Sequence, residues 1–289
     1  MMMATEAKAS TGQTGYCEFQ TRNGARMGFV IQGAGVPVIL MHGSLCDFRY
    51  WGPQINTIAK SHLCIAPSMT HYWPNPLPGL AHRFSWDSHV DELAELIAVE
   101  ANGHAHIVGH SRDGHVAFQL AVRYPALVRT LTLADHAGTI EIGHSTSPAL
   151  PHAVNALRAR SAALIGIGER EQGLRLFVDS VSRPGFWDRS TDEFKEMAFA
   201  NAHTLALQFA DPLQPYSAES AATIRCPTLI IAGQKSPRMF RRNAEALARW
   251  IRDAQHETLA GASHGMNVAN PAGFNRALLA FISKAESAA

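Results

Sequence analysis

The sequence predicts an α/β fold with a doubly wound, mostly parallel sheet that carries an inserted helical segment. Three observations indicate this fold. Short apolar strands alternate with amphipathic helices along most of the chain. Ser111 stands where one of these strands turns directly into a helix. Residues 139–223 carry Ala, Leu and Arg at helical spacing and show no strand pattern.

The predicted strands are apolar or alternating runs that end at turn-forming residues. The first two flank the turn Arg22-Asn23-Gly24, which is typical of a hairpin at an antiparallel sheet edge. The next is continuously apolar, as buried parallel strands are. The strands are expected over residues 16–20, 25–31, 36–41, 63–67, 107–108, 130–134, 227–233 and 256–259.

The predicted helices have apolar residues at intervals of three and four. The second of them also has acidic residues near its start, where the helix dipole favours negative charge. The helices are expected over residues 47–61, 86–101, 114–122, 239–251 and 271–285. Residues 67–83 form a loop rich in Pro, Gly, His and aromatic residues, and loops of this length often carry function.

The domain organisation follows from these elements. Residues 1–15 are rich in Ala, Ser, Thr and Gly and are expected to be a flexible N-terminus. Residues 16–138 and 224–289 are expected to form the α/β core, and residues 139–223 a helical cap. The chain of 289 residues is 46% hydrophobic, which is enough for a large buried core.

The charge balance argues against nucleic-acid and membrane partners. With 25 basic and 24 acidic residues the formal net charge is +1. No apolar run reaches the roughly 18 residues of a membrane span, and no signal-peptide core is present. A soluble, cytoplasmic protein that acts on a small molecule is therefore expected, and the sequence leaves open whether it forms a homodimer.

Cysteine and histidine patterns indicate neither disulfides nor a metal. The cysteines are scattered, at Cys17, Cys46, Cys64 and Cys226, and are expected to be free thiols. The fifteen histidines form no pattern of the kind that holds zinc. We therefore expect no metal and no cofactor.

The strand-turn-helix at Ser111 is typical of a nucleophile elbow, in which a serine at the apex projects from the carboxyl end of the sheet. Gly109-His110-Ser111 fits the first half of the Gly-x-Ser-x-Gly pattern. The second half departs from it, because Asp113 stands where glycine is usual and Gly114 follows.

Together with His42-Gly43 after an early strand and Gly-Ala-Ser-His264-Gly near the end, the elbow makes residues 16–282 resemble the α/β-hydrolase family. The resemblance implies that Ser111 is the nucleophile and His264 the base that activates it. It also implies two backbone N–H donors for an oxyanion, at Ser44 and Arg112.

The third member, the acid, is missing from its usual place in the family. Residues 233–237 contain no Asp or Glu, although most of the family has its acid there. A minority takes the acid from the end of the preceding strand, where this chain offers Asp135. We assign Asp135 to this role, with a turn-capping Asp as its structural alternative and Asp113 as the rival acid.

Aromatic residues and histidines near these strand ends are candidates to line a substrate pocket. The candidates are His42, Tyr50, Trp51, His71, Tyr72, Trp73, His110 and Trp187. Phe177, Phe186 and Phe209 add apolar surface from the helical cap.

The resemblance implies a serine hydrolase that cleaves a carboxylic ester or lactone of a small, mainly apolar compound through an acyl-enzyme. Three alternatives remain open. One is a carbon–carbon bond hydrolase acting on a diketone-like ring-cleavage product. The others are a lyase similar to hydroxynitrile lyases and a non-catalytic ligand-binding module.

Overall fold

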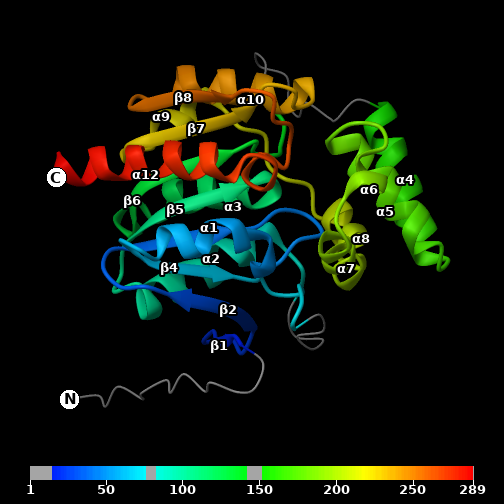
Figure 1. Ribbon diagram of the computed structural model, residues 1–289, viewed down its shortest axis with the longest axis horizontal. Helices are drawn as coiled ribbons and strands as arrows, with labels where there is room; N and C mark the ends of the chain where they lie inside the picture. The colour runs from blue at the N-terminus through cyan, green and yellow to red at the C-terminus, as the bar shows by residue number, and fades with distance from the viewer. Residues whose placement is uncertain (1–14, 76–82, 142–151, 289) are drawn as a thin grey trace.

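The centre of the fold is an eight-stranded sheet in the order β1-β2-β4-β3-β5-β6-β7-β8 (Figure 1). β1 and β2 pair antiparallel, as do β2 and β4, and all other pairs are parallel. This confirms the predicted doubly wound, mostly parallel sheet. The strands are β1 Cys17–Gln20, β2 Arg26–Gln32, β3 Pro37–Met41, β4 Leu63–Pro67, β5 Ala105–His110, β6 Val128–Ala134, β7 Thr228–Gly233 and β8 Ala254–Leu259.

The computed structural model describes residues 15–75, 83–141 and 152–288. Nearly all of the predicted flexible N-terminus, part of the loop 67–83 and residues 142–151 of the predicted cap lie outside these ranges. Within them, no helix combines the length and the apolar character needed to cross a membrane.

Helices cover both faces of the sheet. Ile39 and Met41 of β3 belong to a core shared with α2 (Trp86–Glu100), α3 (Ser111–Arg123) and α10 (Arg238–Trp250). The alternate residues Val38 and Leu40 belong to a second core with α1 (Gly52–Ile58) and α12 (Pro271–Ser287). Because both faces are buried, β3 carries apolar residues at all of its positions rather than at alternating ones.

One predicted helix differs in its start and its end. A helix was expected over residues 47–61, and the structure has a 3₁₀ turn, Phe48–Trp51, followed by the seven-residue helix α1. Asp47 accepts a hydrogen bond from the Arg49 N–H and so caps the 3₁₀ turn. Pro53 in the first turn of α1 has no N–H to continue the preceding turn, so the α-helix starts there.

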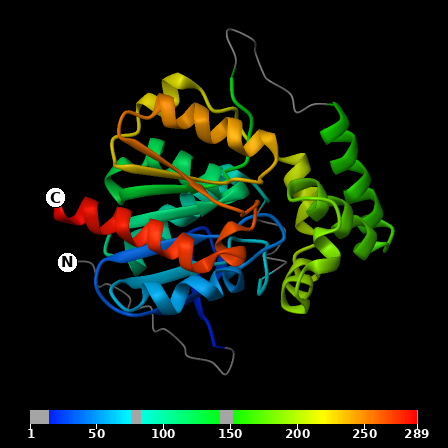
Figure 2. The ribbon, with the colours of Figure 1, turned by 45° about the horizontal axis from the view of Figure 1, so that its top comes forward.

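Between β6 and β7 the chain forms a separate group of helices that lies to one side of the sheet (Figures 1 and 2). We call this group the α4–α8 segment. It comprises α4 His152–Gly166, α5 Arg170–Val181, α6 Phe186–Arg189, α7 Asp192–Ala200 and α8 Thr204–Ala210. A small core of its own includes Leu174, Phe177 and Trp187, and Leu45 from the loop after β3 packs into it. The segment therefore packs against the carboxyl ends of the parallel strands.

Two short helices complete the chain, α9 Ala218–Ala222 before β7 and α11 Met266–Ala269 before α12.

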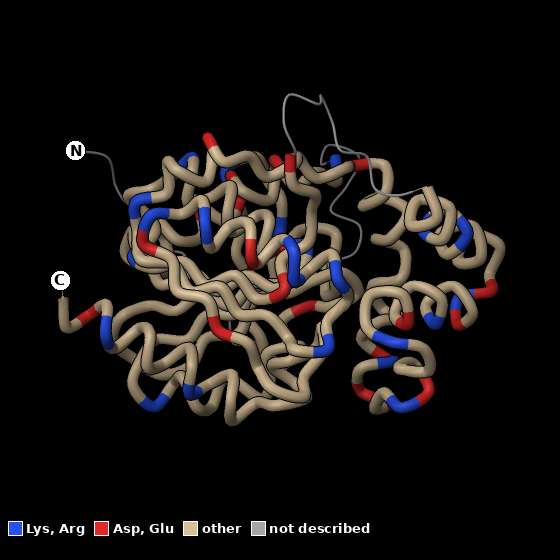
Figure 3. Tube along the Cα trace, turned by 90° about the horizontal axis from the view of Figure 1, so that it is seen from above, with Lys and Arg blue, Asp and Glu red and all other residues tan. Residues whose placement is uncertain are grey.

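Basic and acidic residues are interspersed over the sheet-containing part and the α4–α8 segment (Figure 3).

Candidate active site

Ser111 has the backbone conformation of a sharp strand-to-helix turn. It is the first residue of α3, directly after β5, and its φ of 53° lies in the left-handed region that residues other than glycine rarely adopt. Gly109 permits the turn, because a Cβ there would lie 2.6 Å from the Asp113 carbonyl oxygen and 2.7 Å from Ala117 Cβ. The strained turn holds the Ser111 side chain at the carboxyl end of the sheet.

A chain of hydrogen bonds links Ser111, His264 and Asp135. His264 Nδ1 lies 3.3 Å from Asp135 Oδ2 and donates to it. His264 Nε2 is 3.0 Å from Ser111 Oγ and so is left to accept the hydroxyl proton. All three side chains are buried. The structure brings together the nucleophile, base and acid that the sequence suggested, in the geometry such a relay requires.

The Asp135 carboxylate is held by two donors besides His264. The Gly233 N–H donates to Oδ1 at 3.2 Å, and the Ser236 hydroxyl donates to Oδ2. Both donors belong to the end of β7 and the loop after it, where most of the family has its acid. In this chain that loop supplies neutral donors, which hydrogen-bond to both carboxylate oxygens of Asp135 and fix its orientation.

Two aromatic rings fix the His264 imidazole. Phe240 of α10 stacks on it with ring centroids 4.0 Å apart and an interplanar angle of 23°. The His110 ring lies on it at 4.7 Å, and His110 Nε2 donates to the His264 carbonyl at 2.8 Å. Burial, with the nearby His264 as a second cause, holds the pKa of His110 well below its usual value. His110 is therefore neutral and orients His264 rather than competing with it for a proton.

The loop after β3 packs directly against the elbow. A Cβ on Gly43 would lie 2.8 Å from Ser111 Cβ and 2.9 Å from His110 Nδ1, so only glycine fits there. This contact holds the adjacent Ser44 beside the Ser111 side chain. Arg112 is the second residue of α3, and the first-turn N–H groups of a helix have no acceptor within it. Ser44 and Arg112, the two expected oxyanion donors, thus belong to the two segments that meet at Ser111.

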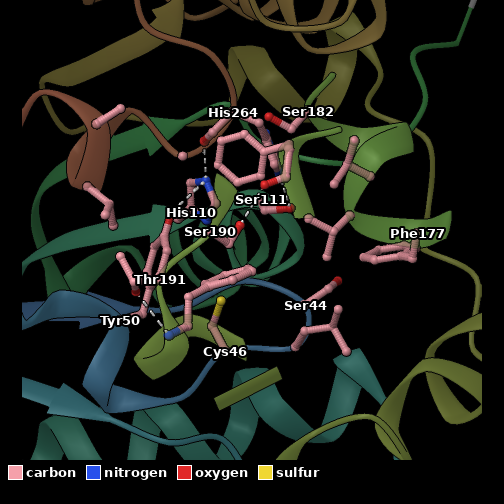
Figure 4. Close-up of a pocket in the computed structure, with 18 of the residues that line it drawn as sticks. Ser44, Cys46, Tyr50, His110, Ser111, Phe177, Ser182, Ser190, Thr191 and His264 are labelled. Atoms are coloured by element: carbon pink, nitrogen blue, oxygen red, sulfur yellow. Dashed lines mark hydrogen bonds between the residues drawn. The ribbon is translucent and has the colours of Figure 1, made fainter. Parts of the chain in front are cut away.

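A cavity of about 260 Å³ opens above Ser111 and His264, and we call it the first cavity (Figure 4). The core supplies Ser44, Tyr50 and His110 to its wall. The α4–α8 segment supplies mainly apolar side chains: Phe177, Val178, Val181, Phe186 and Phe194. The cavity is therefore suited to a small, largely apolar compound.

Of the eight predicted pocket residues, Tyr50 and His110 line this cavity and six do not. Trp51 is fully buried against Phe274 of α12, at a ring distance of 6.0 Å. Trp187 is buried inside the α4–α8 segment, where its indole N–H donates to Glu171. These large side chains pack in the core because burying their area contributes more than exposing them in a pocket.

The other four pack among themselves and against neighbouring aromatic residues outside the first cavity. The His42 and Tyr72 rings lie 4.6 Å apart and both are buried. His71 packs on Phe84. Trp73 packs at a tilt against Phe48 and lies under the Arg49 guanidinium. His42 Nε2 accepts from the Met69 N–H at 3.1 Å, so its role is to join two loops rather than to contact a ligand.

Asp113 stands at the position where the elbow pattern usually has a glycine, which carries no side chain. Its carboxylate is completely buried, has no hydrogen-bond partner and lies 3.6 Å from His42 Nδ1. Burial raises its pKa. The close approach expected of a glycine occurs one residue later, because a Cβ on Gly114 would lie 2.8 Å from His136 Cβ. Asp113 faces away from His264 and is not part of the Ser111 hydrogen-bond chain.

Several residues of the site were not among the candidates from sequence. Gly233, Ser236 and Phe240 hold Asp135 and His264, and Val178, Val181 and Phe194 add to the cavity wall. The lack of an acid in residues 233–237 could have pointed to Ser236. A carboxylate that comes from the neighbouring strand needs a neutral hydrogen-bond donor in this loop, and the Ser236 hydroxyl is one. No group of three or more His, Cys, Asp or Glu residues that could hold a metal occurs in the described part of the chain.

A family model described as "Alpha/beta hydrolase family" matches residues 38–277. The chain belongs to this family. In this alpha/beta hydrolase, the matched region contains His42-Gly43, the elbow and His264, which are the features from which the resemblance was inferred.

This alpha/beta hydrolase is similar to proteins with different activities. A 2-hydroxymuconate semialdehyde hydrolase from Pseudomonas sp. (strain CF600) is 26% identical over 283 residues, covering 92% of this chain and 93% of that protein. A thermophilic esterase from Thermogutta terrifontis has a TM-score of 0.74 at 22% identity, covering 93% of this chain and 98% of that one. An enol-lactonase from Burkholderia xenovorans LB400 has a TM-score of 0.70 at 18% identity, covering 90% and 97%. The structural likenesses establish the fold, and the family supports a hydrolytic enzyme.

Proposed function

We propose that this protein is a serine hydrolase that cleaves carboxylic esters or lactones of small, mainly apolar compounds. The observation that carries the proposal is that Ser111, hydrogen-bonded to His264 and through it to Asp135, opens into an apolar cavity of about 260 Å³. In this proposal the α4–α8 segment acts as the cap of the site. It limits substrates to small molecules and excludes protein and polymer chains.

The mechanism follows from the positions of the donors and acceptors. Ser111 Oγ attacks the ester carbonyl carbon while its proton moves to His264 Nε2. The carbonyl oxygen becomes an oxyanion, which accepts hydrogen bonds from the Ser44 and Arg112 N–H groups. When the intermediate collapses, the bond to the alcohol oxygen breaks and Nε2 returns the proton to that oxygen. An acyl group remains on Ser111.

Water completes the reaction. His264 Nε2 removes a proton from a water molecule as its oxygen attacks the acyl carbon. The bond to Ser111 Oγ then breaks, Oγ regains the proton from Nε2, and the acid leaves. Asp135 stabilises the imidazolium in both halves through its hydrogen bond to Nδ1.

The test is hydrolysis of p-nitrophenyl esters with acyl chains of two to eight carbons and of γ- and δ-lactones. Purified protein is compared with Ser111→Ala. We expect turnover that Ser111→Ala abolishes. Turnover that persists in the variant would discard Ser111 as the nucleophile.

The second candidate is a carbon–carbon bond hydrolase. The similarity to the 2-hydroxymuconate semialdehyde hydrolase favours it. Parallel assays with p-nitrophenyl esters and a vinylogous diketone acid separate the two functions. Higher kcat/KM for the diketone would replace the esterase assignment with this one.

A further inference from the structure

A second cavity, of about 410 Å³, lies between the core and the α4–α8 segment. Ser44 and Phe177 line both the first and the second cavity, so the two meet at these side chains. Figure 4 shows Ser44 and Phe177 at the same edge of the first cavity. The first cavity is lined by one arginine, Arg189, and the second by two, Arg112 and Arg158.

Arg112 has an unused buried donor. Its side chain is only 4% exposed, and Nη2 donates to Asp211 Oδ2 at 2.7 Å. Its guanidinium carbon lies 4.8 Å from the centre of the Phe84 ring. Nη1 is buried and has no hydrogen-bond partner. A buried donor without an acceptor is unfavourable, so an oxygen from a ligand would stabilise this side chain.

Arg158 of α4 carries a charge that no carboxylate balances in the described part of the chain. Its guanidinium carbon lies 5.5 Å from the centre of the Phe209 ring, and burial lowers its pKa. None of the described residues lining the second cavity is acidic. Because burial penalises the charged form, an anion bound in this cavity would stabilise Arg158.

The second cavity is connected to the proposed reaction centre through Ser44. The Ser44 hydroxyl donates to Gln208 Oε1 at 2.6 Å, and Gln208 of α8 also lines the second cavity. The Ser44 backbone is the proposed oxyanion donor. A molecule whose carbonyl lies at Ser111 would therefore have to pass Ser44 to reach Arg112 and Arg158.

We propose that the second cavity binds a carboxylate at the far end of the substrate, so that the preferred substrates are half-esters of dicarboxylic acids. This inference rests on the proposed function. Arginine binds carboxylates with two parallel hydrogen bonds, and Arg158 can offer such a fork. Arg112, whose Nη2 is taken by Asp211, adds the single donor Nη1. Arg112 is already neutralised by Asp211. The single remaining charge, on Arg158, matches a monoanionic carboxylate better than a doubly charged phosphate.

The kinetic test compares charged and neutral esters of equal length. Mono-p-nitrophenyl esters of dicarboxylic acids from succinic to suberic acid are paired with neutral p-nitrophenyl esters of the same chain length. In Arg158→Gln we expect the ratio of kcat/KM for the charged ester to that for the neutral ester to fall at least tenfold, through KM. Arg158→Lys should keep part of the ratio, because it keeps the charge.

Arg160→Gln is the matched control, because Arg160 lies on the same helix and is exposed. It should leave the ratio unchanged. The proposal is overturned if Arg158→Gln leaves the ratio unchanged as well. It is also overturned if Arg189→Gln removes the preference instead, because Arg189 lines the first cavity.

A binding measurement separates failure of this inference from failure of the proposed function. Calorimetry on Ser111→Ala with monomethyl esters of the same dicarboxylic acids needs no turnover. We expect a dissociation constant at least tenfold weaker when Arg158→Gln is added and unchanged when Arg160→Gln is added. Absence of binding, or equal binding in both double variants, overturns the anion site. If binding follows this pattern but no ester is hydrolysed, the proposed function fails alone.

Discussion

Ser236, in the loop after β7, donates its hydroxyl to the carboxylate of Asp135 at the end of β6. The donor comes from the loop in which most of the family has its acid, and the carboxylate comes from the neighbouring strand. A second carboxylate at position 236 would repel Asp135, whereas a hydroxyl stabilises its charge. The exchange of acid and neutral donor between adjacent strand ends explains how His264 keeps an acid although residues 233–237 contain none.

Substitutions at these two positions should differ in severity. Asp135→Asn removes the charge that stabilises the His264 imidazolium, so we expect kcat for a p-nitrophenyl ester to fall by on the order of 10⁴. Ser236→Ala removes one of the donors to Asp135, and we expect a fall of about tenfold. Steady-state kinetics on both variants measure this. A larger loss in Ser236→Ala than in Asp135→Asn would show that Asp135 is not the acid.

Gly43→Ala should disable the site through its shape. The added methyl group would lie 2.8 Å from Ser111 Cβ, on a strained turn that has no freedom to move. We expect kcat/KM to fall about 100-fold, because a displacement of about 1 Å at a reacting group has that effect. Gly52→Ala is the control, since a Cβ there meets no atom within 4 Å. Equal activity in parent and Gly43→Ala would mean that the oxyanion loop is not held by this contact.

Asp113→Ala should stabilise the protein. The Asp113 carboxylate is buried without hydrogen bonds, and burial raises its pKa. A carboxyl group whose pKa is raised in the folded state binds its proton more tightly there, so its ionisation destabilises the fold progressively as pH rises above the unfolded value. We therefore expect Asp113→Ala to increase the free energy of unfolding by about 1–3 kcal/mol at pH 8, measured by urea denaturation.

Activity in the same variant tests the rival acid. Asp113 does not contact His264, so Asp113→Ala should retain ester hydrolysis within a few fold of the parent. A loss as large as that in Asp135→Asn would move the acid role to Asp113. A lower free energy of unfolding at pH 8 would show that the contact with His42 outweighs the desolvation of the carboxylate.

Glu92 of α2 gives the protein a pH-dependent stability. Burial raises the pKa of Glu92 from 4.5 to about 7, although the Thr70 hydroxyl donates to it. Between these values the folded state holds a proton that the unfolded state has lost, so stability should decrease as pH rises from 4.5 to 7. This interval corresponds to about 3 kcal/mol.

The variant Glu92→Gln should remove that dependence. We expect its Tm to match the parent at pH 4 and to exceed it at pH 8, measured by thermal scans across the range. Glu245→Gln, at an exposed position of α10, is the control and should follow the parent at every pH. A parent Tm that rises between pH 4.5 and 7 while Glu92→Gln stays flat would contradict the expected sign.

Sequence patterns were sufficient for the sheet and for the order of the chemical groups along the chain. Apolar runs such as residues 36–41 are typical of buried strands in a parallel sheet. Ser111 and Asp135 each follow a parallel strand, so both lie at the edge of the sheet where the carboxyl ends of these strands meet. His264 could be identified because its loop follows the last strand, where the family that the sequence resembles has its base. The strands follow from local pattern, and the roles of these side chains follow from the resemblance.

The walls of the site could not be predicted, because they depend on contacts between distant segments. Trp51 packs on Phe274 and therefore does not reach the cavity, although it lies only a few residues from Ser44. Phe240 of α10 stacks on His264, which lies in a loop 24 residues further along the chain. A list of aromatic residues near strand ends does not distinguish those that face a cavity from those that fill the core.

The most direct test of the account is covalent labelling of the purified protein with a fluorophosphonate, followed by peptide mass mapping. The parent and Asp135→Asn are compared at equal reagent concentration. We predict a single label on Ser111 that forms at least 100-fold more slowly in Asp135→Asn, because that variant loses the charge that supports His264 as a base. A parent that takes up no label, or a label on another residue, would contradict the central claim that Ser111 is an activated nucleophile.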